Sequence, residues 1–351
     1  MVDAILGISI AGLLAHPGAA RAEHGALSQR PGTDGCISQG GGEMCTDADL
    51  LFGAFSVAVS GDGLNAYVAL ADGRGVASLA RNAITGALTQ LASPMGCISE
   101  DAGAGACTPG IGLRSAASVT VSRDGRNVYV ASQSDAVAVF ARNDETGALS
   151  QLPEPQGCVS QSGSGGHCTQ GKALDGAHSV ALSKDGRFVY VASEISRAVA
   201  VFARNKRTGA LTQLPGEDGC VSENGSTELC TDGVGLGGPV ALAVSPNGRN
   251  VYAVSSPTHQ LAVLARDRRT GTLRPVHCIT DDGSVVCSPA VAFRQPFAVT
   301  VSPDSKRVYV AARDDDAVAV FASDRKTGSL TQLPAPDGCV SDDGAKASAA
   351  S

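Results

Sequence analysis

The sequence predicts an all-β protein in which one small sheet is repeated five times, and two observations carry this prediction. All five tyrosines of the 351-residue chain lie in copies of the same apolar strand, at steps of 62, 61, 62 and 57 residues. The strands alternate large and small side chains with a period of two, and no helical period accompanies them. Self-similarity at a fixed spacing is typical of a chain built from equal units. The repeated tyrosines are Tyr67, Tyr129, Tyr190, Tyr252 and Tyr309.

Each unit of about 61 residues contains four short strands. It opens with an alternating strand such as SVTVS (118–122), turns through Asp-Gly or Asn-Gly, and continues into the tyrosine strand. A third strand such as VAVFAR (137–142) is followed by a turn ending in Thr-Gly and a fourth strand such as GALSQL (147–152). Four short antiparallel strands per unit are typical of one blade of a β-propeller.

The repeated segments resemble the YVTN-type repeats of the lactonase-like β-propeller superfamily, which includes phosphogluconolactonase-type proteins. Two segments show it best, SVTVSRDGRNVYVAS (118–132) and DAVAVFARNDETGALSQL (135–152), and the similarity extends over most of residues 25–344. The resemblance implies a propeller of four-stranded blades, with lactone hydrolysis as a candidate activity. Such relatives usually have seven blades, whereas this chain has five complete units. We expect a closed five-bladed ring, with the extra strand copy at 25–29 added to an edge; the alternative is an incomplete six-position or open ring.

The N-terminus predicts export. An apolar run at 4–15 is followed by the small-x-small pattern Ala20-Arg21-Ala22, which is typical of a signal-peptidase site before Glu23. Asp3 stands where a basic residue is usual, so a misassigned start or a strand remnant is the alternative. We expect a signal peptide at 1–22, one propeller domain at 23–344 and a disordered tail at 345–351.

Ten of the eleven cysteines form local pairs, each lying between the fourth strand of one unit and the first strand of the next. A metal site would favour Cys-x-x-Cys knuckles that converge, whereas these pairs are widely spaced and belong to different blades. One disulfide per unit fits better and would contribute on the order of 2–3 kcal/mol each. Disulfides require an oxidising compartment, so we expect a secreted, periplasmic or cell-surface protein. The predicted pairs are Cys36–Cys45, Cys97–Cys107, Cys158–Cys168, Cys220–Cys230 and Cys278–Cys287, with Cys339 left as a free thiol.

Composition argues against several classes of partner. The net charge is −7 and no long run of Lys or Arg occurs, which argues against nucleic-acid binding. No apolar stretch after the N-terminus approaches the roughly 20 residues that span a bilayer. The Gly-rich segment at 162–166 lacks the Lys-Ser/Thr of a phosphate-binding loop, and we expect no cofactor and no metal.

Functional residues are expected in the variable loop after each tyrosine strand, because loops on a rigid scaffold commonly carry binding groups. Residues that break the repeat are the informative ones. The run at 314–316 would supply oxygen ligands to a hard cation, although a solvated turn is the commoner role. His259 is a candidate general base, and His178 would place one polar group near the channel. The candidates for ligand binding are Asp72, Arg74, Glu194, Arg197, His259, Arg313, Asp314, Asp315 and Asp316.

Two functions follow from these residues. The first is an exported binding or scaffold protein that contacts a glycan, an envelope component or another protein. The alternative is a lactone hydrolase, which needs acid and base groups converging from several blades. Convergence of Glu194, His259 and the 313–316 loop on one pocket would favour the enzyme, and dispersal around the rim would favour binding.

Overall fold

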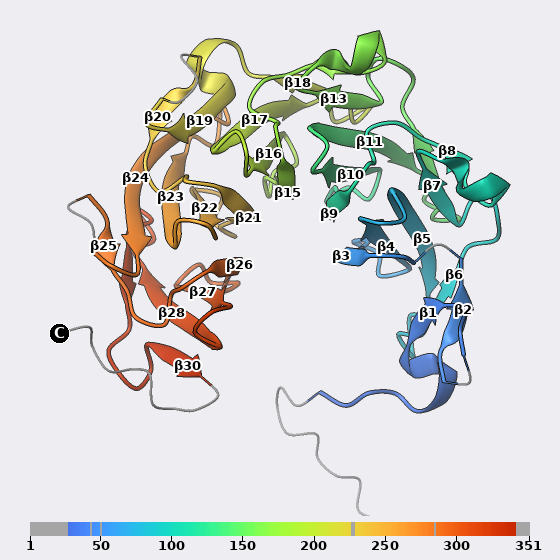
Figure 1. Ribbon diagram of the computed structural model, residues 1–351, viewed down its shortest axis with the longest axis horizontal. Helices are drawn as coiled ribbons and strands as arrows, with labels where there is room; N and C mark the ends of the chain where they lie inside the picture. Colours follow the sequence, from blue (N-terminus) through green and yellow to red (C-terminus); the bar gives the residue numbers. More distant parts are fainter. Residues whose placement is uncertain (1–26, 43, 50, 226–228, 284–285, 342–351) are drawn as a thin grey trace, which may run out of the picture.

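The computed structural model describes residues 27–42, 44–49, 51–225, 229–283 and 286–341, so the expected signal peptide and tail lie outside the described residues. Five sheets stand side by side in an arc around a central channel (Figure 1). We call them blades 1 to 5, formed by residues 54–109, 116–170, 177–233, 239–289 and 296–341. The all-β propeller architecture predicted from the repeat is therefore present.

The strands of the blades follow the predicted order. Blade 1 comprises β3 (Ala54–Val59), β4 (Asn65–Leu70), β5 (Gly75–Arg81), β6 (Leu88–Gln90), β7 (Cys97–Ser99) and β8 (Thr108–Pro109). Blade 2 comprises β9 (Ala116–Val121), β10 (Asn127–Ser132), β11 (Ala136–Arg142), β12 (Leu149–Gln151), β13 (Cys158–Ser160) and β14 (Thr169–Gln170). Blade 3 comprises β15 (Ala177–Leu182), β16 (Phe188–Ser193), β17 (Ala198–Arg204), β18 (Leu211–Gln213), β19 (Cys220–Glu223) and β20 (Thr231–Gly233).

Blades 4 and 5 vary this plan slightly. Blade 4 comprises β21 (Pro239–Val244), β22 (Asn250–Ser255), β23 (Gln260–Arg266), β24 (Leu273–Thr280) and β25 (Ser288–Pro289). Blade 5 comprises β26 (Pro296–Val301), β27 (Arg307–Ala312), β28 (Ala317–Ser323), β29 (Leu330–Gln332) and β30 (Cys339–Ser341). Four short 3-10 turns occur: η1 (Gly32–Gly35), η2 (Ala102–Gly105), η3 (Gly163–Gly166) and η4 (Gly216–Gly219).

The fourth position of each sheet is more elaborate than predicted. In blade 2, both β12 and the cysteine strand β13 pair antiparallel with β11, one after the other, and β14 adds a short parallel strand beyond β13. The disulfide between Cys158 and Cys168 closes the loop between β13 and β14. The other four predicted bridges are also formed. Each bridge therefore staples the outer edge of a sheet rather than a free loop.

The core lies between the blades. Residues on the tyrosine side of one blade, such as Tyr129 and Val137 of blade 2, pack against the facing side of the next, such as Val189 and Phe202 of blade 3. Equivalent clusters join blades 1 and 2, 3 and 4, and 4 and 5. Because the side chains are mostly Val and Ala, the sheets approach closely, as the low aromatic content requires.

A buried polar network joins neighbouring blades on the side of the Asp-Gly turns. Between blades 2 and 3, the Arg204 guanidinium donates to the Tyr129 hydroxyl (2.7 Å), to Asp124 (3.0 Å) and to Asn127 (2.6 Å). The Tyr129 hydroxyl in turn donates to the carbonyl of Gly209 (2.8 Å). We call this arrangement the arginine clasp; Arg142 and Arg266 form the clasps at the two adjoining interfaces. The regular tyrosines therefore serve as interface residues.

The Thr-Gly turn is explained by the same contact. Gly209 has a φ of +90°, and a Cβ there would lie 2.1 Å from the Asn127 amide nitrogen. Glycine is required because the turn is left-handed and the neighbouring blade lies directly against it.

The expected closed five-bladed ring is not formed. The blades leave a gap between blade 5 and the N-terminal segment (Figure 1), which is the open alternative. Tyr309 of blade 5 is 37% exposed, whereas the other four tyrosines are at most 1% exposed. The packing of Val and Ala between closely spaced sheets sets the angle between neighbouring blades. This angle is too small for five blades to complete a circle.

The N-terminal segment covers blade 1 in a different way from that expected. Residues 27–29, the described part of the predicted edge strand, form no strand. Instead β1 (Ile37–Gln39) and β2 (Thr46–Ala48) form a small parallel pair held by the Cys36–Cys45 bridge. Ile37 and Leu51 pack against the outer apolar face of blade 1.

Candidate functional site

The variable loops after the tyrosine strands share one left-handed position. The residue just before the third strand has a positive φ in all five blades although it is not glycine. The tight turn between the second and third strands imposes this conformation, which costs a non-glycine residue conformational energy. The five residues are Arg74, Asp135, Arg197, His259 and Asp316.

Several predicted site residues are held by contacts within or beside their own blade. Arg74 forms an ion pair with Asp101 (2.8 Å) and lies 3.5 Å from Glu100. His259 Nδ1 lies 2.8 Å from Asp281. Both contacts tie the variable loop to the cysteine loop of the same blade, which indicates a structural role.

The three aspartates of the acidic run in blade 5 differ in their contacts. Asp315 accepts a hydrogen bond from the backbone N–H of Arg294 (2.7 Å), so it fixes the loop that enters the blade. Asp314 and Asp316 make no ion pair in the described part of the chain. No group of three metal-ligating side chains is found among the described residues, and the run therefore offers no assembled cation site.

Three side chains from different blades meet in the central channel. The imidazole of His178 lies between Phe55 of blade 1 (ring centroids 5.5 Å apart) and Phe297 of blade 5 (5.9 Å), and both contacts are edge-to-face. All three occupy the same position at the start of the first strand. We call them the channel trio. The sequence pointed only to His178, because aromatic residues on blades 1 and 5 give no sign that they converge.

The channel trio has a distinct electrostatic environment. Burial lowers the pKa of His178, and the charge of Glu194 opposes this shift without cancelling it. The imidazole is therefore neutral near pH 7. His178 is 7% exposed, whereas Phe55 and Phe297 are 47% and 38% exposed and present open aromatic surface.

Two opposite charges flank the trio. Glu194 of blade 3 and Arg313 of blade 5 occupy the same position, directly after the tyrosine strand. Arg313 and Asp316 line a cavity of about 730 Å³ whose apolar wall includes Phe297, Val318 and Val340. Neither Glu194 nor Arg313 has an ion-pair partner within the described residues.

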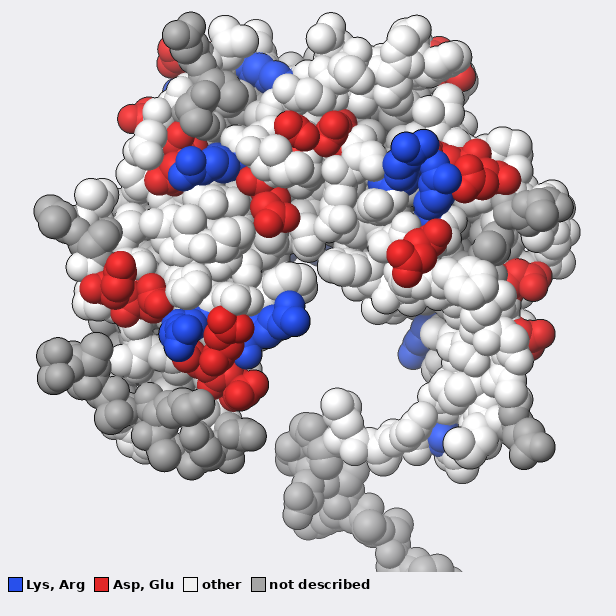
Figure 2. Space-filling model, in the orientation of Figure 1, with Lys and Arg blue, Asp and Glu red and all other residues white. Residues whose placement is uncertain are grey.

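The remaining candidates lie elsewhere on the rim. Arg74 lines a separate hollow of about 530 Å³ with Glu100 and Arg114. Asp72 lies beside Gly53, and Arg197 makes no side-chain ion pair in the part of the chain that is described. Figure 2 shows the loop face, on which charges of both signs are dispersed around the arc rather than gathered in one pocket. Among the described residues, no ion pair joins Glu194, His259 and the 313–316 loop, and the cavity that Arg313 and Asp316 line includes neither Glu194 nor His259.

The described residues contain no helix with the length and apolar character needed to cross a membrane.

Comparison with known proteins supports the fold. Residues 236–336 match the family described as lactonase, seven-bladed β-propeller. No protein of curated function matches the chain.

Solved structures show the same architecture at low identity. A candidate 6-phosphogluconolactonase from Bacteroides fragilis is 19% identical with a TM-score of 0.53, over 77% of this chain and 66% of that one. A protein from Lactobacillus plantarum is 22% identical with a TM-score of 0.58, over 80% and 70%. This chain thus spans about two thirds of the length of both, and it holds five blade sheets where the matched family has seven blades. The resemblance to the lactonase-like β-propellers is confirmed, in sequence over residues 236–336 and in fold over most of the described chain.

Proposed function

We propose that this protein binds a small sugar-acid ligand at the loop face, in the cavity beside the channel trio. The observation that carries the proposal is the composition of this cavity, which has an exposed Phe297 and an apolar wall. At its edge lies the guanidinium of Arg313, which forms no ion pair with any described residue. Ligand sites are commonly apolar with a few polar groups that fix orientation. A sugar acid matches this pattern because it has an apolar C–H face, several hydroxyls and one carboxylate.

The charges support an acidic ligand. Guanidinium binds carboxylate in a planar, bidentate geometry that lysine cannot reproduce. Asp316 on the same cavity would accept hydrogen bonds from ligand hydroxyls. The five disulfides support a location outside the reducing cytosol, where such ligands would be met as nutrients or as envelope components.

The proposal is tested by calorimetric titration of the mature protein with a panel of aldonic and uronic acids. We expect saturable binding that Arg313→Ala weakens about tenfold, as expected for loss of a charge-assisted hydrogen bond. Arg126→Ala, which removes an exposed arginine from the Asp-Gly turn of blade 2, is the matched control and should leave the affinity unchanged. Equal affinity in the Arg313→Ala protein would refute the site.

Lactone hydrolysis remains a second candidate, favoured by the family match and by one feature of the site. A neutral, buried His178 within the influence of Glu194 has the charge state of a general base. Against it, the contacts with Phe55 and Phe297 leave the His178 imidazole largely enclosed. The other candidate acids and bases are dispersed. Under this alternative, His178→Ala would abolish lactone turnover.

A further inference from the structure

The turn face, opposite the loop face, carries a charge pattern that the repeat does not require. The turn between the third and fourth strands has the same backbone in every blade: an Asn or Asp side chain accepts hydrogen bonds from the backbone N–H groups two and three residues later. The two tip residues between this Asn or Asp and the Thr-Gly are free to vary. Folding therefore does not dictate their charge.

The charge of these tip residues changes from blade to blade. They are Ala83-Ile84 in blade 1 and Asp144-Glu145 in blade 2. In blades 3, 4 and 5 they are all basic: Lys206-Arg207, Arg268-Arg269 and Arg325-Lys326. The neighbouring Asp-Gly-type turns add Lys184, Arg187 and Arg249. A chain with a net charge of −7 thus places nine of its 27 Lys and Arg residues on one side of three adjacent blades.

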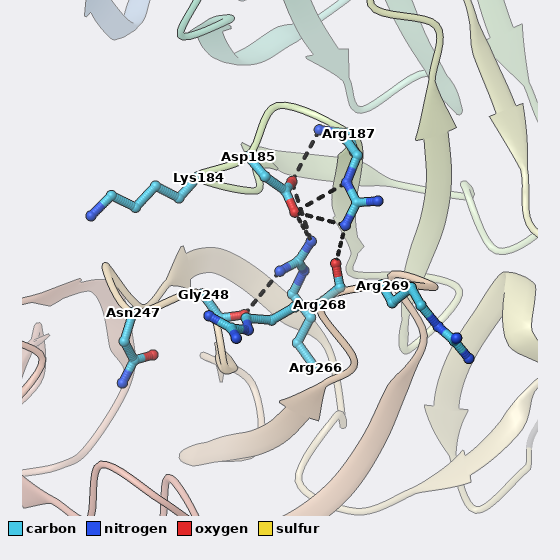
Figure 3. A pocket seen from close by; sticks show the side chains of 8 residues that line it. All are labelled: Lys184, Asp185, Arg187, Asn247, Gly248, Arg266, Arg268 and Arg269. Carbon is cyan, nitrogen blue, oxygen red and sulfur yellow. Dashed lines mark hydrogen bonds and ion pairs between the residues drawn. The ribbon is translucent and has the colours of Figure 1, made fainter.

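Seven of these nine cations line two hollows that share a wall. One has a volume of about 460 Å³ and is lined by Lys184, Arg187, Arg268 and Arg269 together with Asp185, Asn247, Gly248 and Arg266 (Figure 3). The second, of about 730 Å³, is lined by Arg249, Arg325 and Lys326, and it shares Lys184, Asn247 and Arg268 with the first. The two hollows therefore form one basic surface across blades 3 to 5.

The single carboxylate of this surface is already occupied. Asp185 lies 3.3 Å from Arg187 and 3.2 Å from Arg266, as Figure 3 shows, and it is the only acidic residue among those lining either hollow. Arg187 also donates to the backbone carbonyl of Arg268. No ion pair in the described part of the chain involves Lys184, Arg249, Arg268, Arg269 or Arg325.

The site is partly preorganised. The guanidinium groups of Arg187 and Arg266 both lie over the ring of Phe188, with centroid distances of 5.4 and 5.3 Å. An aromatic ring attracts a guanidinium and helps to hold it in place. Because both groups also pair with Asp185, they form a fixed support beneath the free cations rather than the anion ligands themselves. Unpaired cations held close together repel one another, and a bound anion relieves this repulsion.

We propose that the turn face of blades 3 to 5 binds a sulfated or phosphorylated polysaccharide. Arginine recognises sulfate and phosphate in a bidentate geometry, and two adjoining hollows suit successive anionic groups of a polymer rather than one small ion. The lining contains no aromatic residue on which a base could stack, which argues against single-stranded nucleic acid. The disulfides also favour a ligand met outside the cytosol.

The experiment uses a heparin oligosaccharide of defined length as the probe and measures its affinity for the mature protein by fluorescence anisotropy at two or more salt concentrations. We expect Arg268→Ala/Arg269→Ala to weaken binding at least about tenfold and to reduce the dependence of affinity on salt. The matched control is Arg123→Ala/Arg126→Ala, which removes two exposed arginines from the same face of blade 2. It should change the affinity less than about twofold.

The chain itself supplies a stronger variant. Arg268→Asp/Arg269→Glu places the tip sequence of blade 2 in blade 4, where the same turn backbone accepts it, and should abolish binding. Equal losses in the blade 2 and blade 4 variants, or no heparin binding even at low salt, would overturn the proposal. Tighter binding of a DNA duplex than of heparin would overturn the assignment of ligand class.

Discussion

At the scale of single residues, the most regular positions of the sequence serve the interfaces between blades. The hydroxyls of Tyr67, Tyr129 and Tyr190 each reach the next blade and join a network of an arginine, an acid and a glycine carbonyl. Burial raises the pKa of Tyr129 and of Tyr190 to about 12, so both hydroxyls remain protonated donors at any physiological pH. The tyrosine therefore recurs in the repeat because it packs between blades, not because it contacts a ligand.

The clasp between blades 4 and 5 shows how the network tolerates change. There Ser323 replaces the arginine and lies 2.9 Å from the Tyr252 hydroxyl, and Asn247 replaces the aspartate. The loss of the cation is accompanied by loss of its anion. A buried charge left without its partner is costly, whereas removing both is tolerated.

This natural exchange predicts a coupling energy. Arg204→Ser alone should lower the free energy of unfolding by about 3 kcal/mol, because Asp124 and Tyr129 lose a buried partner. Combining it with Asp124→Asn should recover about 1–3 kcal/mol relative to the sum of the single changes. Urea unfolding of the four proteins of this cycle measures the coupling. Strictly additive effects would show that the clasp is not a unit.

The acids of the clasps also predict a pH dependence. Burial alone would raise the pKa of Asp185. Hydrogen bonds from Ser183 and the Arg187 backbone, together with the charge of Arg266, instead lower this pKa from 3.8 to about 2. A depressed pKa stabilises the folded state above about pH 4, and this contribution is lost as the pH falls toward 2. We expect the difference in melting temperature between the wild type and Asp185→Asn to shrink over that range. A difference that stays constant from pH 6 to pH 2 would contradict the assignment.

At the scale of secondary-structure elements, strand order, turn types and disulfide pairing were all predictable because each is encoded within one repeat. The split of the fourth strand into two segments, as in β12 and β13, was not predicted, because a three-residue strand carries too little periodicity to be recognised. The channel trio was missed for another reason. Phe55, His178 and Phe297 lie far apart in the sequence, and only the curvature of the arc brings them together.

The cysteine strands predict a defined pattern of oxidation. Peptide mapping without reduction should recover five bridges, each within one blade or the N-terminal segment, and thiol titration of the unfolded protein should find the single equivalent of Cys339.

Removing one bridge with Cys158→Ser/Cys168→Ser should lower the free energy of unfolding by about 2–3 kcal/mol, because the ten-residue loop gains freedom in the unfolded chain. Bridges between different blades would contradict the staple arrangement.

At the scale of the whole molecule, the arc exposes at its end a surface that is buried everywhere else. Val318 of blade 5 is 40% exposed, whereas Val137, at the same position of blade 2, is fully buried against blade 3. The seven-bladed family would cover this surface with a further blade. Whether it is open in solution can be measured with one matched pair of variants.

Val137→Thr should lower the free energy of unfolding by about 1–3 kcal/mol, because it buries a hydroxyl in an apolar interface. Val318→Thr should change it by less than about 0.5 kcal/mol, as is usual for exposed positions. Chemical unfolding of both proteins gives the comparison. Comparable losses would show that the outer face of blade 5 is covered in solution.

The two faces of the arc differ in their chemistry. The loop face presents an aromatic trio flanked by opposite charges, and the turn face presents an unpaired basic surface across blades 3 to 5. Neither face assembles the converging acids and bases that hydrolysis needs, within the residues described. We propose binding at both faces.

The proposal of binding at the loop face is tested most directly by a lactone-hydrolysis assay on the pure mature protein, run with sugar lactones beside the His178→Ala protein. We expect no turnover above the uncatalysed rate in either protein, while the corresponding sugar acid binds the wild type saturably and the Arg313→Ala protein more weakly. Turnover by the wild type that His178→Ala abolishes would contradict it and assign the protein to the lactone hydrolases.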